Sequence, residues 1–389
     1  MLFRSWEQAT GGDLLRWPDV ARVVDHVGVE HLLVTRHALV RQVLTDARTF
    51  RPDNALDAIT PIPVAALRML AAHRFRLPPT LANNGGDTHP GIRALIADAL
   101  HPTRVAAQRD WLAGLVRHRV ADLSVVLARG TPVDLHTDLA ADLPLLVLAR
   151  LVELPDAPVA AVKRFARAAL ELFWAPLDAD RQQVLAAEMG CFHQVLREFA
   201  ATGDGLVGDL RAAGHPPDVV VGALFFLLVA GQETTSQFLT LLMHRLTGEP
   251  AVLAGLRDGS VNVADVVEEG LRLEPPIVTW RRVAGVDTTL GGTVVPAGAS
   301  VVLWLARAGR DPAVVQSPDE LRPGQRGSRR HLAFGAGVHR CVGDQLARME
   351  ASTLVAEAAP LLTGVRVVRP PHYPDNLTFR MPDTFVVRR

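Results

Sequence analysis

Cysteine and lysine are scarce in this sequence of 389 residues, and charge of neither sign is in excess. The two cysteines, Cys191 and Cys341, stand far apart, which argues against a fold held together by disulfides. Lysine and arginine together number 41, as do aspartate and glutamate, and Lys163 is the single lysine. A formal net charge of zero gives no electrostatic reason to expect nucleic acid or an anionic membrane as a partner.

Long apolar runs are also missing. The longest run, Val219 to Gly231, holds about 13 residues, whereas a helix that crosses a bilayer needs about 20. The N-terminal stretch MLFRSWEQATGGD has no basic patch followed by an apolar core, so it lacks the pattern of a secretory signal. We therefore expect a soluble, cytoplasmic protein with no membrane partner, and we expect it to be a monomer.

No repeat, low-complexity tract or linker divides the chain, so residues 1–389 are predicted to form one domain. Helical periodicity dominates, strand patterns lie toward the two ends, and Gly291-Gly292 closes a predicted hairpin. The predicted fold class is mainly α with small peripheral β-sheets. The predicted helices cover 91–100, 104–129, 139–152, 158–175, 181–202, 217–247, 263–273 and 342–362, and strands lie near 30–35, 286–306 and the C-terminus.

Cys341 lies in the segment FGAGVHRCVG (334–343), between a glycine-bearing loop and a long helical pattern. A thiolate at a helix start is stabilised by the local N–H groups and the helix dipole. The glycines remove side-chain bulk, so a flat ligand can lie against the backbone, while Phe334 offers an apolar face and His339 a polar one. This combination suits a haem, with its apolar macrocycle, its iron and its two anionic propionates. The alternative is a buried free cysteine in a glycine loop.

The predicted central helix, about 217–247, is apolar nearly all round up to Val229 and should therefore be buried. The string AGQETT (230–235) interrupts it with a glycine, an acid and two hydroxyls, which are unfavourable in a buried helix. We expect the helix to be distorted there, with Thr234 bonded to a carbonyl or to water and Glu233 as a proton source. An ordinary kinked helix is the alternative.

Glu269 and Arg272 are spaced i, i+3 on the predicted helix 263–273, which Asn262 can cap. An isolated pair of this kind is usually a solvated salt bridge worth less than about 1 kcal/mol. The pair precedes a proline pair, a hairpin and the Cys341 loop.

The three motifs, AGxETT, ExxR and FGxGxHxCxG, occur in the order found in the cytochrome P450 family, which the sequence resembles from about His89 to the C-terminus. The resemblance implies the family's helical fold and a haem b (iron-protoporphyrin IX) with O2 as co-substrate. It makes Cys341 the ligand of the iron, and it places Glu233 and Thr234 beside bound dioxygen. This order of motifs also implies a structural role for the Glu-x-x-Arg pair instead of a solvated salt bridge, and it implies that Arg322 completes the network of this pair, although Pro323 stands where the family commonly has an aromatic residue.

The same resemblance carries the family's haem-contacting positions to nine further residues, the basic ones facing the propionates. They are His89, Arg93, Ala230, Arg282, Phe334, Gly335, Gly337, His339 and Gly343. Arg281 could take the place of Arg282 through a shift of one residue. Substrate contacts are expected within 51–86, 170–195, Phe225, Phe226, Val229, Ile277 to Trp280, and Leu377 to Phe379.

These features predict a haem-thiolate monooxygenase that oxidises, by hydroxylation, an apolar small molecule such as an intermediate of secondary metabolism. No flavin- or dinucleotide-binding fingerprint is found, so we expect electrons from a separate ferredoxin and ferredoxin reductase, docked with help from Arg329, Arg330 and Arg340. A substrate tethered to a carrier protein also fits. Oxidative coupling or ring closure, a haem-binding sensor and a haem-free helical interaction protein remain as alternative functions.

Overall fold

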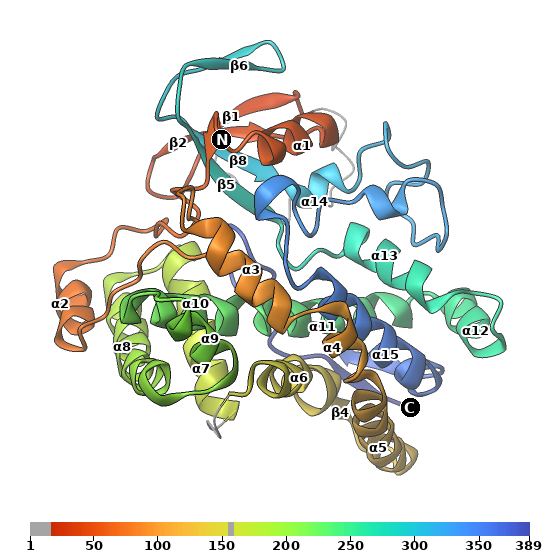
Figure 1. The fold of residues 1–389 in the computed structure, drawn as a ribbon. Coiled ribbons are helices and arrows are strands. Elements are labelled where there is room, and N and C mark those ends of the chain that lie inside the picture. Colours follow the sequence, from red (N-terminus) through yellow and green to blue (C-terminus); the bar gives the residue numbers. More distant parts are fainter. Residues whose placement is uncertain (1–16, 155–158) are drawn as a thin grey trace.

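The computed structural model of the chain describes residues 17–154 and 159–389. Helices form most of it (Figure 1). The α-helices are α1 (His37–Thr45), α2 (Val64–Ala72), α3 (His89–Ala99), α4 (Pro102–Ala106), α5 (Arg109–Ala128), α6 (Leu143–Val152), α7 (Val159–Trp174), α8 (Ala179–Thr202), α9 (Gly205–Ala212), α10 (Pro217–Ala230), α11 (Glu233–Thr247), α12 (Pro250–Asp258), α13 (Val263–Leu273), α14 (Leu305–Ala308) and α15 (Asp344–Leu362). The chain also forms a π-helix, η2 (His136–Ala140), and two 3-10 helices, η3 (Ser328–Arg330) and η4 (Gly337–His339).

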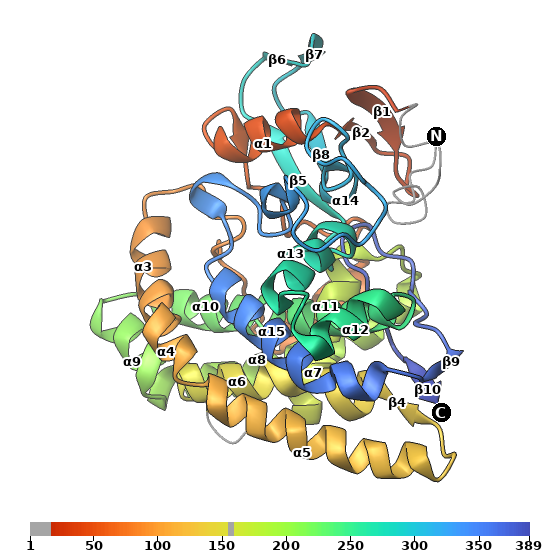
Figure 2. The ribbon, with the colours of Figure 1, turned by 90° about the vertical axis from the view of Figure 1, so that its right-hand side faces the viewer.

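The strands form three small sheets at the edge of the helical body (Figure 2). The strands are β1 (Val20–Val24), β2 (Glu30–Val34), β3 (Phe50–Arg51), β4 (Val133–Asp134), β5 (Thr279–Ala284), β6 (Thr288–Leu290), β7 (Thr293–Val295), β8 (Ser300–Trp304), β9 (Arg366–Arg369) and β10 (Val386–Arg388). The largest sheet has the order β1-β2-β8-β5-β3, in which only β2 and β8 pair in parallel. The other two are β4-β10-β9 and the hairpin β6-β7.

Several predicted elements are confirmed. Helix α13 has the predicted bounds, and the Asn262 side chain caps it by accepting a hydrogen bond from the Ala264 N–H at 2.8 Å. The hairpin turns at Gly291 and Gly292, whose φ angles of +54° and +79° are those that glycine tolerates in a two-residue turn. The mainly helical fold with small peripheral sheets is confirmed as well.

Other predictions need correction. The predicted helix 104–129 is two helices, α4 and α5, and the predicted helix 342–362 begins only at Asp344. Helices α1, α2, α9 and α12 were not predicted, because runs of eight or nine residues carry few repeats of the helical period. Strand β5, which supplies part of the site described below, was also missed.

The central helix divides at Gly231-Gln232 into α10 and α11 (Figure 1). A Cβ on Gly231 would lie 2.6 Å from the Leu227 carbonyl oxygen, so the chain comes closer to itself here than another residue allows. Among the described residues, Pro217–Thr247 is the one stretch long and apolar enough to cross a membrane, and 72% of its most apolar window is buried inside the protein. The stretch is therefore the core helix that the sequence predicts.

Candidate active site

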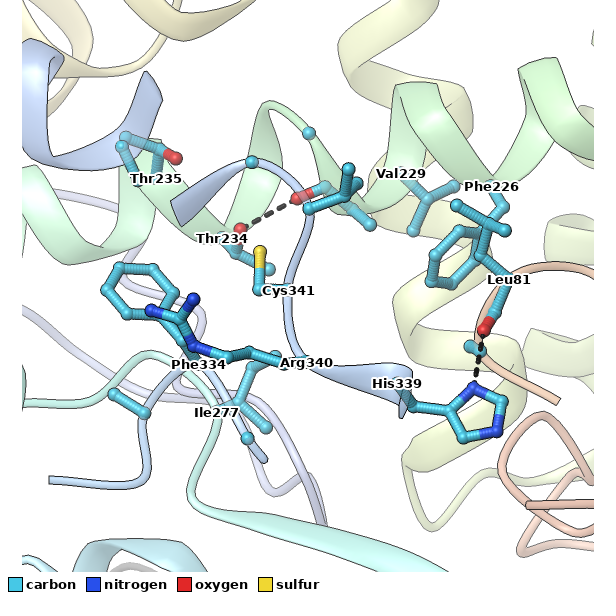
Figure 3. Close-up of a pocket in the computed structure, with 18 of the residues that line it drawn as sticks. Leu81, Phe226, Val229, Thr234, Thr235, Ile277, Phe334, His339, Arg340 and Cys341 are labelled. Carbon is cyan, nitrogen blue, oxygen red and sulfur yellow. Dashed lines mark hydrogen bonds between the residues drawn. The ribbon is translucent and has the colours of Figure 1, made fainter. Parts of the chain in front are cut away.

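A cavity opens where the α10–α11 break faces the loop that carries Cys341 (Figure 3). Residues of α3, α10, α11, β5 and the start of α15 contribute to its lining, together with residues of α1, α6, α7, α13, α14 and the segment before β10, and the lining is mostly apolar. The cavity therefore joins segments that are more than 200 residues apart in the sequence, since Arg93 and Cys341 both line it. Thr234 and Phe334 lie around the same cavity (Figure 3).

Cys341 is held at the cavity by its backbone, whose N–H donates to the Phe334 carbonyl at 2.8 Å. Its accessible surface faces the cavity, and the surrounding burial raises the pKa of the thiol, although a hydrogen bond from the Gly343 backbone N–H acts in the opposite sense. Helix α15 begins at Asp344, two residues later than predicted, so the thiol precedes the helix as the sequence predicts but lies further from its start. A bound cation would offset the burial and favour the thiolate.

Two of the loop glycines have different roles. A Cβ built on Gly335 meets nothing within 4 Å, and this residue lines the cavity with a φ of +67°. Gly337 does not line the cavity, because it packs against α1, where a Cβ would lie 2.6 Å from the Leu44 carbonyl oxygen. Of these two glycines only Gly335 lines the cavity, as Phe334 and Gly343 do, and their contact with a haem stays a prediction.

Thr234 lines the cavity at the helix break, and its hydroxyl donates to the Ala230 carbonyl at 2.7 Å (Figure 3). Ala230 lines the cavity as well. The break between α10 and α11 thus leaves a hydroxyl and a carbonyl facing the space above the Cys341 loop.

Glu233 is buried but does not line the cavity. Its carboxylate pairs with the Lys163 ammonium of α7. Lys163 also donates to the side-chain oxygens of Gln232 at 2.9 Å and Ser236 at 3.3 Å. The structure does not place the Glu233 carboxylate at the cavity, because the single lysine of the chain pairs with it; the role of Glu233 as a proton source stays a prediction.

One edge of the cavity collects basic groups. Arg282 is almost fully buried, and its Nε has no hydrogen-bond partner among the described residues. Burial lowers the pKa of Arg282 to about 10 and that of His339 to about 4, with the nearby positive charge of Arg282 adding to the effect at His339. Arg93 donates to the Arg340 carbonyl at 2.6 Å and lines the same edge.

His89 lies behind this edge, with its ring 4.5 Å from the ring of His339, and its Nε2 is buried without a partner. Arg281 does not compete for the site. Successive side chains of a strand point to opposite faces, and the Arg281 guanidinium donates to the Asp57 carbonyl while Arg282 lines the cavity. Of the two alternatives that the sequence left open, the structure therefore places Arg282 at the cavity.

These observations fit a haem. Arg282 and His89 carry buried nitrogen atoms without partners, and the pKa values of His89 and His339 are lowered because a positive charge there is buried. Two carboxylates at this edge would supply the missing counter-charge. The apolar lining and the open space beside Gly335 suit a flat macrocycle, and Cys341 supplies a sulfur ligand.

Glu269 and Arg272 form a fully buried pair, with Nε–Oε1 and Nη2–Oε2 distances of 2.7 and 2.8 Å. Arg272 also donates to four backbone carbonyls of the segment that follows α14. They are Gly309, Ser317, Pro318 and Glu320. Burial alone would raise the pKa of Glu269, but the contacts with Arg272 outweigh it and the pKa is lowered.

Arg322 does not complete this network with its side chain. Its guanidinium is exposed and donates to Ser317, whereas its backbone N–H donates to Glu269 at 3.1 Å. The side-chain amide of Gln325 takes the third place, with its Nε2 2.8 Å from Glu269 Oε2. The Arg322 guanidinium is exposed and bonded to Ser317, so the prediction that it completes the network was wrong for the side chain.

Glu268 is a site residue that the sequence reasoning missed. It accepts hydrogen bonds from Arg348 of α15 at 2.6 Å and contacts His331 at 3.0 Å. Arg348 lies over the Phe334 ring at 4.5 Å, so Glu268 fixes both the loop and the helix on either side of Cys341. The signal available in the sequence was the acid directly before Glu269, together with an Arg and a His near the cysteine.

Comparison of the chain with known proteins identifies the class of enzymes to which it belongs. The family model described as Cytochrome P450 matches residues 217–358. The chain is 31% identical to cytochrome P450-SOY of Streptomyces griseus, over 87% of this chain and 81% of that protein, and 31% identical to cytochrome P450 GfsF of Streptomyces halstedii, over 85% and 79%. The solved structure of cytochrome P450 CREJ in complex with (4-ethylphenyl) dihydrogen phosphate has a TM-score of 0.90 and 26% identity, and covers 97% of this chain and 95% of that one.

The class is that of the haem-dependent oxidoreductases. The chain belongs to the cytochrome P450 family. It is a monooxygenase that binds haem b and uses O2, as the sequence predicts.

Proposed function

We propose that this enzyme holds its haem through the Cys341 sulfur and hydroxylates an apolar small molecule with electrons from a separate ferredoxin and ferredoxin reductase. The observation that carries this proposal is the cavity in which the Cys341 thiol, the Thr234 hydroxyl and the unpaired basic edge at Arg282 meet. When bound, the haem supplies oxygen activation and the thiolate donates electron density that favours O–O cleavage.

The residues of the chain have separate tasks in this proposal. Arg93, Arg282 and His339 orient the haem by binding its carboxylates, with His89 supporting His339 from behind. The Gly343 N–H tunes the Cys341 sulfur through its hydrogen bond. The apolar lining excludes bulk water and receives the substrate.

Proton supply rests on the helix break. Thr234 holds a proton on its hydroxyl, which faces the cavity and can turn from the Ala230 carbonyl to a ligand. Glu233 is the acid on the same helix, but its carboxylate must leave Lys163 and take up a proton from solvent before it can deliver one to that hydroxyl. Lys163 is partly exposed, so this pair has a route to solvent.

Electron delivery is proposed to use the surface over the Cys341 loop. Arg330 is exposed there without an ion pair among the described residues, whereas Arg329 is bonded to Asp265 at 2.9 Å and Arg340 is paired with Asp344. We expect Arg330 to contribute more than Arg329 to docking an acidic carrier. Charge reversal at Arg330 should slow reduction in a salt-dependent way, and unchanged rates would remove this part of the proposal.

The proposal is tested with the haem-loaded protein. Cys341→Ala should abolish the thiolate form of the ferrous–CO spectrum, and an unchanged spectrum would refute the ligand assignment. Incubation with electron donors and labelled O2 should add one labelled oxygen to the product. Loss of two hydrogens without added oxygen would support oxidative coupling instead, and haem uptake without turnover would support the sensor.

We also propose that the enzyme is a cytoplasmic monomer of one domain and that it acts in secondary metabolism, on either a free or a tethered substrate. A titration of the spin state of the iron with free compounds and with the same compounds on a carrier protein separates a diffusible from a tethered substrate. Among the relatives, a β-dihydromenaquinone-9 omega-hydroxylase of Mycobacterium tuberculosis, 28% identical over 78% of this chain and 63% of that protein, oxidises a large apolar molecule by its name.

A further inference from the structure

Resting on the proposed function, we propose that this enzyme selects neutral substrates that carry a flat aromatic ring. Three aromatic side chains, Trp174, Trp280 and Phe379, line the cavity together, and we name them the aromatic wall. The proposed substrate is thus not any apolar molecule but an aryl compound, whose ring packs against the aromatic wall.

The wall is assembled from three distant segments. Trp174 is the last residue of α7, Trp280 is the second residue of β5, and Phe379 lies in the segment before β10. Backbone hydrogen bonds fix them to one another, because the Leu377 N–H donates to the Trp174 carbonyl at 2.8 Å and the Val278 N–H donates to the Thr378 carbonyl at 2.7 Å. The rings are thus positioned by main chain and not by flexible side chains alone.

The ring geometry is that of attractive aromatic pairs. Centroid distances are 4.9 Å for Trp174–Phe379, 6.2 Å for Trp174–Trp280 and 6.5 Å for Trp280–Phe379, with interplanar angles of 65°, 32° and 84°. In the two pairs that include Phe379 the edge of one ring meets the face of the other, an arrangement that contributes stabilisation beyond buried area. Trp280 is only half-buried, so part of its ring remains available to a ligand.

Charge is confined to a different part of the lining. The basic residues that line the cavity are Arg93, Arg282, His339 and Arg340, and they belong to the edge assigned to the haem carboxylates or to the Cys341 loop. No acidic side chain lines the cavity among the residues that the structure describes. The wall therefore offers a ligand polarisable ring surface without a counter-ion, which suits a neutral aryl group.

Aromatic residues also cluster elsewhere in this protein without facing the cavity. Phe165 and Phe192 stack at 4.4 Å and 21° inside the core, and Phe165 is fully buried. They show what plain core packing looks like here. The wall differs because each of its three rings lines the cavity and Trp280 is only half-buried, so a ligand can reach the wall at Trp280.

The test compares naphthalene with trans-decalin, which have the same number of carbon atoms, by equilibrium dialysis against the haem-loaded protein. Burial of apolar surface alone does not favour naphthalene, so a preference for it reports ring contacts. We expect the parent to bind naphthalene about tenfold more tightly, and Trp280→Leu to reduce this preference by about fivefold while decalin affinity changes less than about twofold.

Trp111→Leu is the matched control, because Trp111 is half-buried on α5 beneath Arg150 and does not line the cavity. It should leave both affinities unchanged. If Trp280→Leu fails to fold, Trp280→Phe and Phe379→Leu serve in its place, and each should lower the preference in part.

Equal binding of the two compounds by the parent, or an equal loss of both in the Trp280 variant, would overturn the inference. Failure of the proposed function would look different, because the parent would then lack the thiolate form of the ferrous–CO spectrum. A normal spectrum without a ring preference would reject the aromatic wall and leave the haem-thiolate assignment standing.

Discussion

Two buried carboxylates, Glu233 and Glu269, each pair with a basic side chain, yet their surroundings differ. The side chains of Glu269 and Arg272 are 0% and 1% exposed, whereas those of Glu233 and Lys163 are 6% and 21% exposed. Arg272 donates to Glu269 through two nitrogens and to four carbonyls, while Lys163 is a compact charge with three contacts. A sealed pair of this kind holds a loop in place, and a partly solvated pair can open.

The two pairs differ because the basic partner of Glu269 is an arginine and that of Glu233 is a lysine. The planar guanidinium of an arginine fits a carboxylate with two parallel hydrogen bonds and remains charged, whereas the ammonium of a lysine can rotate and exchange partners. Removing one member of a sealed pair leaves an uncompensated charge in the core, which destabilises by about 3–5 kcal/mol. When one member of a pair near solvent is removed, water can hydrate the remaining charge, so the free energy of unfolding falls much less.

Glu269→Gln should have the largest effect on stability. The amide keeps the shape but removes the charge that Arg272 needs, so we expect the free energy of unfolding to fall by about 3–5 kcal/mol and haem content to fall with it. Urea unfolding and haem absorbance measure both. Arg322→Ala, which removes an exposed guanidinium, is the control and should change stability by less than about 0.5 kcal/mol. Equal stability of the two variants would contradict the sealed pair.

Glu268 extends the comparison of buried carboxylates to the dependence of stability on pH. Burial alone would raise the pKa of Glu268, but His331 and Arg348 lower it from 4.5 to about 2. A lowered pKa means that the stabilisation is present above the unfolded value and is lost as pH falls toward the folded one. We expect the free energy of unfolding to fall by roughly 3 kcal/mol between about pH 4.5 and pH 2 from this group.

Glu268→Gln should remove that part of the pH dependence and lower stability at neutral pH. Urea unfolding at a series of pH values gives the slope for both proteins. Glu320→Gln, at an exposed position, should retain the slope of the parent. A parental slope in Glu268→Gln would assign the acid sensitivity to other carboxyls.

Thr234→Ala tests whether the hydroxyl at the helix break beside Glu233 takes part in proton supply. The variant loses the hydroxyl that faces the cavity, so we expect product per electron pair to fall about tenfold or more, with hydrogen peroxide formed instead, and stability to change by less than about 1 kcal/mol. Oxygen uptake, peroxide and product are measured together. Thr234→Ser keeps the hydroxyl and should retain most of the coupling. Full coupling in Thr234→Ala would exclude the hydroxyl from proton supply.

Lys163→Met should have a much smaller effect on folding than Glu269→Gln. The pair is partly solvated, so we expect a loss of about 1 kcal/mol, with a coupling energy to Glu233 of similar size in a double-mutant cycle with Glu233→Gln. The same cycle on Glu269 and Arg272 should give a coupling several times larger. Comparable coupling energies would show that both pairs are structural and that Lys163 does not release Glu233.

Local features of the chain were accessible from the sequence. The Asn262 cap, the turn at Gly291-Gly292 and the interruption at Gly231 depend on neighbours within a few residues, and all three were predicted with their positions. The ten-residue Cys341 segment likewise carries enough fixed positions to indicate the family. The start of α15 was misplaced by two residues, since helix ends depend on loop geometry that periodicity does not specify.

Contacts between distant segments were decided only by the tertiary structure. The sequence contains Lys163, Gln325 and Trp280, but nothing near them specifies that they meet Glu233, Glu269 and Trp174. Those meetings depend on how α7, β5 and the loops pack, because side chains far apart in the chain become neighbours only when the core fixes their backbones. The sequence by itself thus determined the motifs and their local conformations, whereas burial and packing decided which acid is sealed, which can open and where the aromatic wall stands.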